Sequence, residues 1–294
     1  MSERPHFDLQ SHSRHSDGAL EPAGVVALAA RAGVSLLALT DHDTVAGVDE
    51  ALAAGAQQGV TVVPAIELSA VHEGREDLHI LGYRIDHRDE ALAALLAGFR
   101  EQRRSRLTAM ADRLRRLGFS LGEEVPVPTE PGGAVGRPHL AAAVLAEPAN
   151  GERLRREGLD RDAGAFLGAY LVPGAPAYTP RSGPEVREAI EIVHRAGGVA
   201  VWAHPFWDVA GIPEVLTLVD RFASWGLDGV EAFYPFHEAA QTRAVAAHCA
   251  ERGLLRTGSS DFHGPEHPRF CAFAAFELHG LVAELGVIEP EGAT

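Results

Sequence analysis

The sequence of 294 residues contains no lysine, and this absence excludes two kinds of enzyme. A Schiff-base mechanism needs a lysine amine, and a P-loop nucleotide site needs the lysine of its glycine-rich motif. No Gly-x-Ser-x-Gly segment is present either, so a serine hydrolase of that type has no support. A Schiff-base enzyme and a P-loop nucleotide site are therefore excluded, and a serine hydrolase of the Gly-x-Ser-x-Gly type is unsupported.

Long apolar runs and cysteine are also scarce. No apolar stretch approaches the roughly 18 residues of a membrane-spanning helix, so we expect no membrane association. Residues 1–7 lack a basic and apolar signal pattern, which favours a cytoplasmic protein. The two cysteines, Cys249 and Cys271, form no Cys-x-x-Cys pair, and we expect both to be reduced and structural.

Acidic residues outnumber basic ones by 41 to 26, which gives a formal net charge of −15. This balance opposes tight binding of long duplex nucleic acid, because such binding needs a basic surface. Divalent metal ions would offset part of the negative charge locally. Apolar residues make up 46% of the chain, enough for one large domain or one domain plus an insert.

Short apolar segments alternate with helical patterns in the two outer parts of the sequence. Seven strands are expected, one starting at residue 7 and the others at 35–40, 60–66, 78–85, 199–203, 229–233 and 254–258. Nearly continuous apolar strands separated by helices indicate a parallel α/β sheet. Polar residues at successive strand ends indicate a barrel, whose site lies at that face.

The alternation is interrupted between residues 87 and 183, where most patterns are helical. Apolar residues recur at three-and-four spacing through 90–118, and seven arginines between Arg100 and Arg116 occupy the other face. We interpret this face as solvated; an RNA-binding module is the alternative, which the overall acidity disfavours. The predicted division is a barrel of residues 1–86 and 184–294 with 87–183 inserted as a helical cap.

Histidines and carboxylates follow most of the expected strands, and His79 lies on the strand expected at 78–85. Eight of them are candidate metal ligands: His12, Asp17, His42, Glu67, His79, His204, Asp261 and His263. One histidine at a strand end is more often a satisfied core residue, but eight such positions together are hard to obtain by chance. Mixed imidazole and carboxylate ligands suit zinc, manganese or iron, and eight ligands imply at least two ions. Paired ions can clamp an attacking hydroxide and a phosphoryl oxygen. We assign eight further side chains mostly to packing or to orienting ligands: Asp8, Asp43, His15, His72, His194, His237, His248 and His267.

Several segments match, in order, the motifs of a known family. They are residues 9–13, 16–18, 40–43, 67, 79–83, 203–205 and 260–263. Over about residues 7–264 the chain thus resembles the PHP (polymerase and histidinol phosphatase) family of metal-dependent phosphoesterases. The resemblance implies a distorted (β/α)7 barrel with up to three divalent ions. It implies one ion at Asp17, His42 and His263, a second at Glu67, His79 and His204, and a third at His12, Glu67 and Asp261.

The segment 136–140, Gly-Arg-Pro-His-Leu, is similar to an insert motif of one subgroup of that family. The subgroup contains nucleoside 3′,5′-bisphosphate phosphatases and 5′–3′ exoribonucleases that act on short RNA. The resemblance implies that Arg137 and His139 contact substrate phosphate. An arginine fork can bind a phosphate, and a histidine can donate a proton. The alternative is that Arg137 forms a surface ion pair and His139 packs at a helix start.

Three positions depart from the family pattern. Gln10 stands in place of the first metal-binding histidine, and Ala175 in place of a basic residue that the subgroup often has. Phe206 and Trp207 replace a Gly-Arg pair. The loss of two positive groups weakens the prediction of a bisphosphate substrate. Phe206 and Trp207 are candidates for stacking on a base or sugar, but packing in the core is the favoured interpretation.

The predicted activity is hydrolysis of a small phosphorylated metabolite, a nucleotide or short oligonucleotide phosphate, by attack of metal-bound hydroxide on phosphorus. Two to three ions of manganese, iron or zinc are the predicted cofactors. A cyclic phosphodiesterase or a sugar or histidinol phosphatase is the alternative within the family, because fold alone does not select the substrate. A catalytically impaired metal-binding regulatory protein is the alternative of another class. It is weakened because only Gln10 departs from the ligand pattern.

Overall fold

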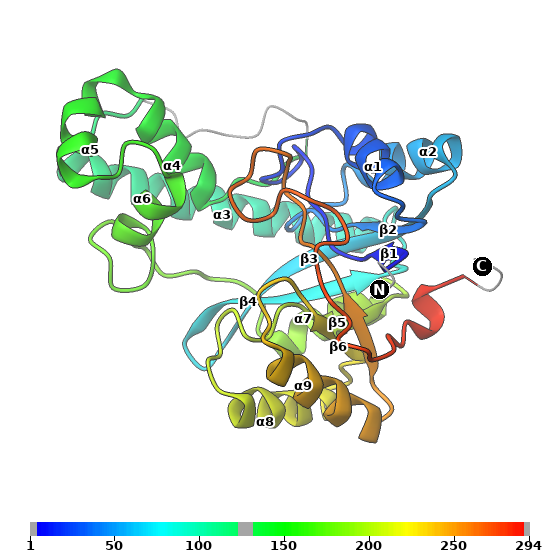
Figure 1. The fold of residues 1–294 in the computed structure, drawn as a ribbon. Coiled ribbons are helices and arrows are strands. Elements are labelled where there is room, and N and C mark those ends of the chain that lie inside the picture. Colours follow the sequence, from blue (N-terminus) through cyan, green and yellow to red (C-terminus); the bar gives the residue numbers. More distant parts are fainter. Residues whose placement is uncertain (1–4, 123–131, 291–294) are drawn as a thin grey trace.

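A computed structural model describes residues 5–122 and 132–290 (Figure 1). Seven strands form one sheet whose spatial order follows the chain from β1 to β7. The strands are β1 (Phe7–Asp8), β2 (Leu36–Leu39), β3 (Thr61–His72), β4 (Arg75–Tyr83), β5 (Val199–Trp202), β6 (Gly229–Phe233) and β7 (Leu255–Gly258). All seven predicted strands are therefore present, although β3 runs further toward the C-terminus than predicted.

The sheet is mixed, which corrects the prediction of a parallel sheet. β4 runs antiparallel to both β3 and β5, and the other neighbouring pairs are parallel. A tight turn at Glu73 and Gly74, both with positive φ, joins β3 to β4, so no crossover helix is needed there. The apolar pattern of residues 78–85 could not reveal the direction, because a strand buried on both faces reads the same either way.

The two edges of the sheet approach each other, so the sheet nearly closes into a barrel. The Leu9 amide donates a hydrogen bond to the Gly258 carbonyl at 3.2 Å, and a parallel bridge joins Ser11 to Phe262. The Asp8 carboxylate accepts hydrogen bonds from the amide and hydroxyl of Ser260. The distorted seven-stranded barrel is thus confirmed, with its closure made by loop residues and side chains.

Five helices surround the barrel: α1 (Pro22–Arg31), α2 (Val48–Gln58), α7 (Val186–Arg195), α8 (Ile212–Ala223) and α9 (Ala239–Glu251). α1 packs on α2 and α8 packs on α9 (Figure 1). Proline at the first or second position of α1 and of α8 fits the start of a helix, where no backbone amide partner is lost. Within residues 5–122 and 132–290, no helix is long and apolar enough to cross a membrane.

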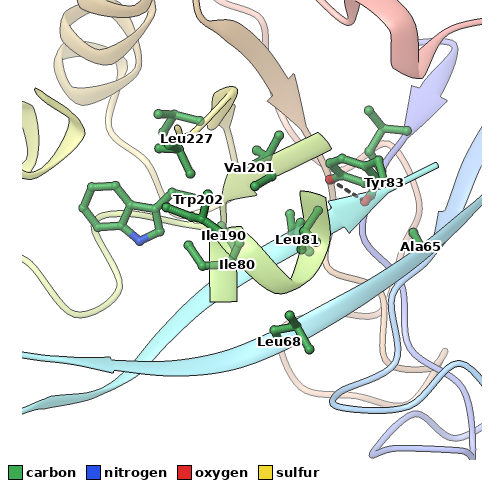
Figure 2. Packing of buried hydrophobic residues seen from close by; sticks show 14 of the residues in the cluster. Ala65, Leu68, Ile80, Leu81, Tyr83, Ile190, Val201, Trp202 and Leu227 are labelled. Atoms are coloured by element: carbon green, nitrogen blue, oxygen red, sulfur yellow. Dashed lines mark hydrogen bonds between the residues drawn. The ribbon is translucent and has the colours of Figure 1, made fainter. Parts of the chain in front are cut away.

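The main hydrophobic cluster lies between the sheet and several helices, α7 among them. Figure 2 shows Ile190 of α7 among Ile80, Leu81, Val201 and Trp202 of β4 and β5. The approach is close: a Cβ atom on Gly82 would lie only 2.8 Å from Val193 Cγ2, so this position needs glycine. The Tyr83 hydroxyl donates to the Leu9 carbonyl at 2.8 Å and ties β4 to the end of β1 (Figure 2).

The long helix α3 (Glu90–Arg116) joins this cluster to a second one. Leu92 and Leu96 belong to the main cluster, whereas Leu107, Met110 and Leu114 belong to the second. The second cluster also contains residues of α4 (Arg137–Ala146), α5 (Gly151–Glu157) and α6 (Ala163–Tyr170). Two short 3₁₀ helices, η1 (Pro148–Asn150) and η2 (Gly286–Ile288), complete the described elements. Figure 1 shows α4, α5 and α6 gathered away from α8 and α9. This separation supports our proposal that residues 87–183 are a cap inserted into a barrel of 1–86 and 184–294.

Candidate metal centre

Seven histidine and carboxylate side chains form three overlapping groups at the barrel. The groups are His12, Asp17, His42 and His263; His42, Glu67 and His79; and His12, Glu67 and Asp261. Within each group, one ligand atom of every residue lies within 4.8 Å of the others. The eighth candidate, His204, places Nε2 3.3 Å from Glu67 Oε1 and 3.3 Å from His79 Nδ1. All eight candidate ligands therefore lie in one cluster, which we call the metal centre.

The elements that carry these side chains differ in part from the prediction. His12, Asp17, His42, His204, Asp261 and His263 follow the ends of strands. Glu67 lies inside β3 instead, so its predicted strand-end position is wrong, whereas His79 lies inside β4, on the strand that was expected to carry it. In the antiparallel pair Glu67 is opposite Leu81 and Ser69 is opposite His79. Glu67 and His79 are therefore diagonal neighbours on one face of the hairpin, which brings their side chains into contact.

Glu67 lies at the middle of the metal centre and is fully buried. Its Oε1 atom lies 2.6 Å from His79 Nδ1, and its Oε2 atom lies 3.1 Å from His12 Nε2. His42 Nδ1 is 3.5 Å from Oε2 on the same side. Burial alone would raise the pKa of Glu67, but the surrounding imidazoles, His42 and His79 first, hold that pKa well below its usual range. Glu67 is therefore an anion in contact with several imidazoles.

Unsatisfied polar atoms gather in the metal centre. Among the described residues, five of its buried atoms have no hydrogen-bond partner: His12 Nε2, Asp17 Oδ1, His42 Nδ1, Glu67 Oε2 and Asp261 Oδ1. Each such atom is costly to bury, and five in one place call for a common partner. Nitrogen and carboxylate oxygen atoms are the ligands of manganese, iron and zinc. The residues present thus fit the divalent ions that the resemblance implies.

Neighbouring groups orient two of these side chains. His263 Nδ1 lies 2.7 Å from the backbone carbonyl oxygen of Asp261, which leaves Nε2 directed to Asp17 Oδ1 at 3.5 Å. The Tyr234 hydroxyl donates to Asp261 Oδ2 at 2.9 Å and leaves Oδ1 toward His12 at 3.1 Å. Hydrogen bonds of this kind fix the tautomer and direction of metal ligands.

Two candidate ligands, and the residue that follows a third, have positive φ angles although none is glycine. They are Asp43 at 51°, His204 at 27° and Asp261 at 55°. Non-glycine residues rarely adopt this left-handed region, and such strain clusters at functional sites.

The metal centre should bind ions in competition with protons. Burial disfavours the charged form of His12 and of His204, yet the adjacent carboxylates outweigh it. The pKa of His12 is held well above its ordinary value by Asp261 and Glu67, and Glu67 raises the pKa of His204 to about 9. Both rings thus carry a proton near neutral pH, and a coordinating imidazole must lose it. Rising pH removes the competitor, so metal affinity should increase with pH.

We expect the apparent affinity for Mn²⁺ to rise about tenfold per pH unit for each displaced proton between about pH 6 and pH 8. Calorimetric titrations in buffers of different ionisation enthalpy would measure the affinity and the protons released. An affinity that is independent of pH, with no proton release, would contradict the assigned roles of His12 and His204.

Gln10 lies two residues before His12, in the segment that follows β1. It is fully buried, its Oε1 accepts a hydrogen bond from the Ser259 hydroxyl at 3.4 Å, and its Nε2 has no partner among the described residues. The Ser259 hydroxyl, which has one proton, also hydrogen-bonds to Glu231, a buried carboxyl group, at a shorter distance, so the Gln10 contact is the weaker of the two. A neutral amide oxygen is a weaker ligand than imidazole for manganese, iron or zinc. The ion nearest Gln10 should therefore be the most weakly held.

We predict that Gln10→His increases the number of tightly bound ions, from two in the natural chain toward three. Elemental analysis and manganese titration of both proteins would give the stoichiometry. Ser259→Ala is the matched control, because it alters the Gln10 contact without adding an imidazole. Three equally tight ions in the natural chain would refute the reasoning from ligand type.

A cavity of ≈ 120 Å³ opens onto the metal centre between the barrel and α3, α4 and α6. Four arginines line it beside Asp17, His42 and His79, namely Arg103, Arg106, Arg137 and Arg181. We call it the arginine cavity. Arg137 donates to Asp77 at 2.8 Å, and the Arg106 Nη2 atom is buried without a hydrogen-bond partner among the described residues. Burial first, and then the neighbouring Arg103, lower the pKa of Arg181 to about 9.

The arginine cavity was not predicted from the sequence, because the sequence indicates that the arginine face of 100–116 is exposed to solvent. The side chains of Arg103 and Arg106 are only 12% and 11% exposed, whereas Arg104 is 55% exposed. Arg100, also half-buried, donates to the Asp43 backbone carbonyl. A spacing of three residues places Arg100, Arg103 and Arg106 on one stripe, and this signal separates them from Arg104. The prediction of a solvated face is wrong for that stripe.

Two further predictions concern His139 in α4 and the Phe206-Trp207 pair after β5. His139 Nδ1 accepts a hydrogen bond from the Gly136 amide at 3.1 Å at the start of α4, and His139 lines neither described cavity. Its role as a proton donor stays a prediction. Phe206 is half-buried and packs against the main cluster as expected, but Trp207 is exposed, so core packing is wrong for Trp207.

Comparison with known proteins adds independent information. A family model described as PHP domain matches residues 8–120. The chain is 34% identical to a 3′,5′-nucleoside bisphosphate phosphatase from Chromobacterium violaceum, over 88% of this chain and 87% of that protein. It is 32% identical to a 5′-3′ exoribonuclease from Haemophilus influenzae, over 88% and 90%. A solved structure from Bifidobacterium adolescentis, described as a metal-dependent phosphoesterase, matches with a TM-score of 0.78, 29% identity and 91% coverage of both chains.

Proposed function

The chain belongs to the PHP family of metal-dependent phosphoesterases, and on that premise we propose that its substrate is a nucleotide or a short oligonucleotide phosphate. Hydrolysis of a phosphoester with the help of metal ions is its activity. We also propose which side chains bind the metal ions. His12, Asp17, His42, Glu67, His79, His204, Asp261 and His263 would hold two or three ions of manganese, iron or zinc. A cytoplasmic location stays a prediction from the sequence.

The observation that carries the proposed substrate is the position of the arginine cavity. His42 and His79 belong to the metal centre and also line that cavity. The rest of a substrate whose phosphate is bound at the ligands would therefore extend into the arginine cavity. The four arginines of the cavity outnumber its two lining carboxylates, Asp17 and Asp77. Carboxylates behind the lining offset part of this charge, because Arg103 and Arg181 pair with Asp43 and Arg106 pairs with Glu76. The guanidinium N–H donors that these pairs leave over support a substrate with a further anionic group next to the reacting phosphate, as nucleotides and oligonucleotides have.

When bound, divalent ions would lower the pKa of a coordinated water and offset the charge on phosphoryl oxygens. The residues of the chain would supply the positioning. Asp77 holds the Arg137 guanidinium at 2.8 Å, so that its other donors are available to phosphate oxygens. Arg106 Nη2 is buried, lies 3.6 Å from Glu76 Oε2 and makes no hydrogen bond among the described residues, so a phosphate oxygen could accept one from it. The impaired regulatory protein is the weaker alternative, because all eight candidate ligands lie together.

The experiment is a substrate panel with purified protein and added manganese. It should contain a nucleoside monophosphate, a nucleoside 3′,5′-bisphosphate, a 5′-phosphorylated dinucleotide, a cyclic phosphodiester and two sugar phosphates. We expect kcat/KM to be highest for one of the nucleotides, by about tenfold over the sugar phosphates, as one extra charged hydrogen bond would give. A sugar phosphate or cyclic diester preferred over every nucleotide would overturn the proposal.

Arg137→Ala should raise KM for a nucleotide about tenfold or more while leaving metal content unchanged, because a hydrogen bond to a charged group contributes about 1.5–3 kcal/mol. Steady-state kinetics and elemental analysis measure the two quantities. Arg104→Ala is the matched control, since Arg104 is an exposed arginine of α3 outside the arginine cavity. Loss of metal with an unchanged KM would instead assign Arg137 to support of the metal centre.

A further inference from the structure

Two aromatic side chains are exposed beside the metal centre. Trp207 is 47% and Phe236 is 49% exposed, and the other large hydrophobic residues exposed in the described part of the chain are aliphatic. Single exposed aliphatic residues are ordinary and need no explanation. Adjacent exposed aromatic rings beside a functional site instead mark a binding surface.

These two rings form one surface with a third. The ring centroid of Trp207 lies 6.4 Å from that of Phe236 and 6.0 Å from that of Phe270, and Phe236 and Phe270 are 5.5 Å apart. Phe270 in turn packs on His263 of the metal centre at 5.3 Å. We call Trp207, Phe236 and Phe270 the aromatic wall. Phe270 supports it from below, because Phe270 is buried.

The backbone fixes the aromatic wall relative to the metal centre. The Trp207 amide donates to the His204 carbonyl at 2.9 Å, so one turn presents both side chains, and their ring centroids lie 6.3 Å apart. Phe206 anchors that turn in the main cluster and packs edge-on against His237 at 5.0 Å. Trp207 is therefore held in place although half of it is exposed.

A second cavity, of ≈ 130 Å³, lies between the aromatic wall and the candidate ligands. Trp207 and Phe270 line it together with Glu67, His204 and Asp261. His42 and His79 line both this cavity and the arginine cavity. The metal centre thus has an arginine side and an aromatic side.

We propose that the aromatic wall binds the nucleobase of the substrate by stacking on Trp207, while the reacting phosphate lies among the candidate metal ligands. The inference rests on the proposed function and specifies how its substrate is recognised. Every nucleobase has a flat π face, and stacking on aromatic side chains tolerates any base. The Arg269 guanidinium lies over the Trp207 ring, 6.0 Å from its centroid, so a base would stack on the other face of the ring or take the place of the guanidinium. A sugar phosphate without a base has no flat face to present to the aromatic wall.

Trp207 also provides an optical test that does not depend on turnover. The chain has three tryptophans, of which Trp202 is buried in the core and Trp225 packs against it. The full-length protein with manganese bound is titrated with non-hydrolysable phosphonate analogues of adenosine 5′-monophosphate and of ribose 5-phosphate, so that binding is measured without turnover. Stacking should quench tryptophan emission with the nucleotide only. In Trp207→Phe the quenching should disappear, while calorimetry still detects nucleotide binding.

The affinity of the two ligands gives a second measurement. Trp207→Ala should weaken binding of adenosine 5′-monophosphate about tenfold relative to ribose 5-phosphate, as expected for the loss of one stacked base. Val282→Ala is the matched control, because Val282 is an exposed apolar residue that lines neither cavity. A 5′-phosphorylated dinucleotide tests whether the stacked base belongs to an oligonucleotide or to a mononucleotide. If the dinucleotide binds more tightly than the monophosphate, the aromatic wall binds oligonucleotides. If the two bind equally, the aromatic wall binds mononucleotides.

Equal weakening of both ligands in Trp207→Ala, or no quenching by the nucleotide, would overturn the stacking proposal. Phosphate release from nucleotides by the natural chain with manganese would still support the proposed function in that case. Conversely, absence of hydrolysis with every metal would remove the proposed function, and base-selective quenching would still show that the aromatic wall binds bases. Melting curves of both variants confirm that a changed affinity does not reflect unfolding.

Discussion

Replacing Glu67 with glutamine is expected to lower turnover by about a thousandfold and to reduce the metal content, because Glu67 belongs to two of the three ligand groups. The change conserves volume and removes one negative charge. The side chain contacts His12, His42, His79 and His204, so a neutral amide would leave these imidazoles without their common anion. Steady-state kinetics, elemental analysis and a melting curve measure the three consequences.

Glu231 provides the matched control for this substitution. Both glutamates are fully buried in the barrel, but Glu231 belongs to none of the ligand groups. Burial raises the pKa of Glu231 to about 8, so the group is largely protonated at neutral pH and an amide resembles it. Glu231→Gln should keep the metal content. If Glu67→Gln keeps the turnover and metal content of the natural chain, Glu67 is not a metal ligand. If both variants lose turnover and metal equally, the loss reflects a disturbed barrel interior rather than a missing ligand.

Asp261→Asn is expected to lower turnover by about a hundredfold or more with the fold intact. Asp261 Oδ1 has no hydrogen-bond partner among the described residues and lies 3.1 Å from His12 Nε2. Against the effect of burial, His263 and His12 lower the pKa of Asp261, which is therefore an anion. His204→Ala should have an effect of similar size, since it removes an imidazole next to Glu67.

Tyr234→Phe tests the orientation of the Asp261 carboxylate separately from its role as a metal ligand. It removes only the hydrogen bond to Asp261 Oδ2, and loss of such an orienting contact typically costs about tenfold or more. The expected order of turnover is natural chain, Tyr234→Phe, then Asp261→Asn, with metal loss greatest in the last. Full activity and full metal content in Asp261→Asn would remove Asp261 from the metal centre.

The barrel and its candidate ligands could be predicted because the signals are local. Short apolar strands, each followed within a few residues by histidine or aspartate, place those side chains at one barrel face. The direction of β4 was not predictable in the same way. Its turn, Glu73-Gly74, lacks the asparagine or aspartate that marks a tight hairpin, and the apolar run of β4 carries no information on direction.

The arginine cavity and the aromatic wall could not be predicted, because both are formed by contacts between segments that are distant in the sequence. Arg103 points inward because α3 packs where Asp43 and Ser69 of the barrel accept its hydrogen bonds. Nothing near Arg103 in the sequence records those partners. Trp207 is similar, because an aromatic residue after a strand is compatible with burial or exposure. Only the turn that anchors Phe206 in the main cluster leaves Trp207 at the surface.

The strained backbone at Asp43, His204 and Asp261 has a consequence for the supply of folded protein in the cell. Each left-handed residue costs about 1–3 kcal/mol, and the unsatisfied atoms of the metal centre add to that cost. These costs reduce the margin by which the folded chain is favoured over the unfolded one. Ions that bind only the folded chain shift that balance back by mass action, so the melting temperature should rise with manganese concentration. Metal scarcity would then reduce the lifetime of the protein as well as its turnover, and its abundance would follow metal availability.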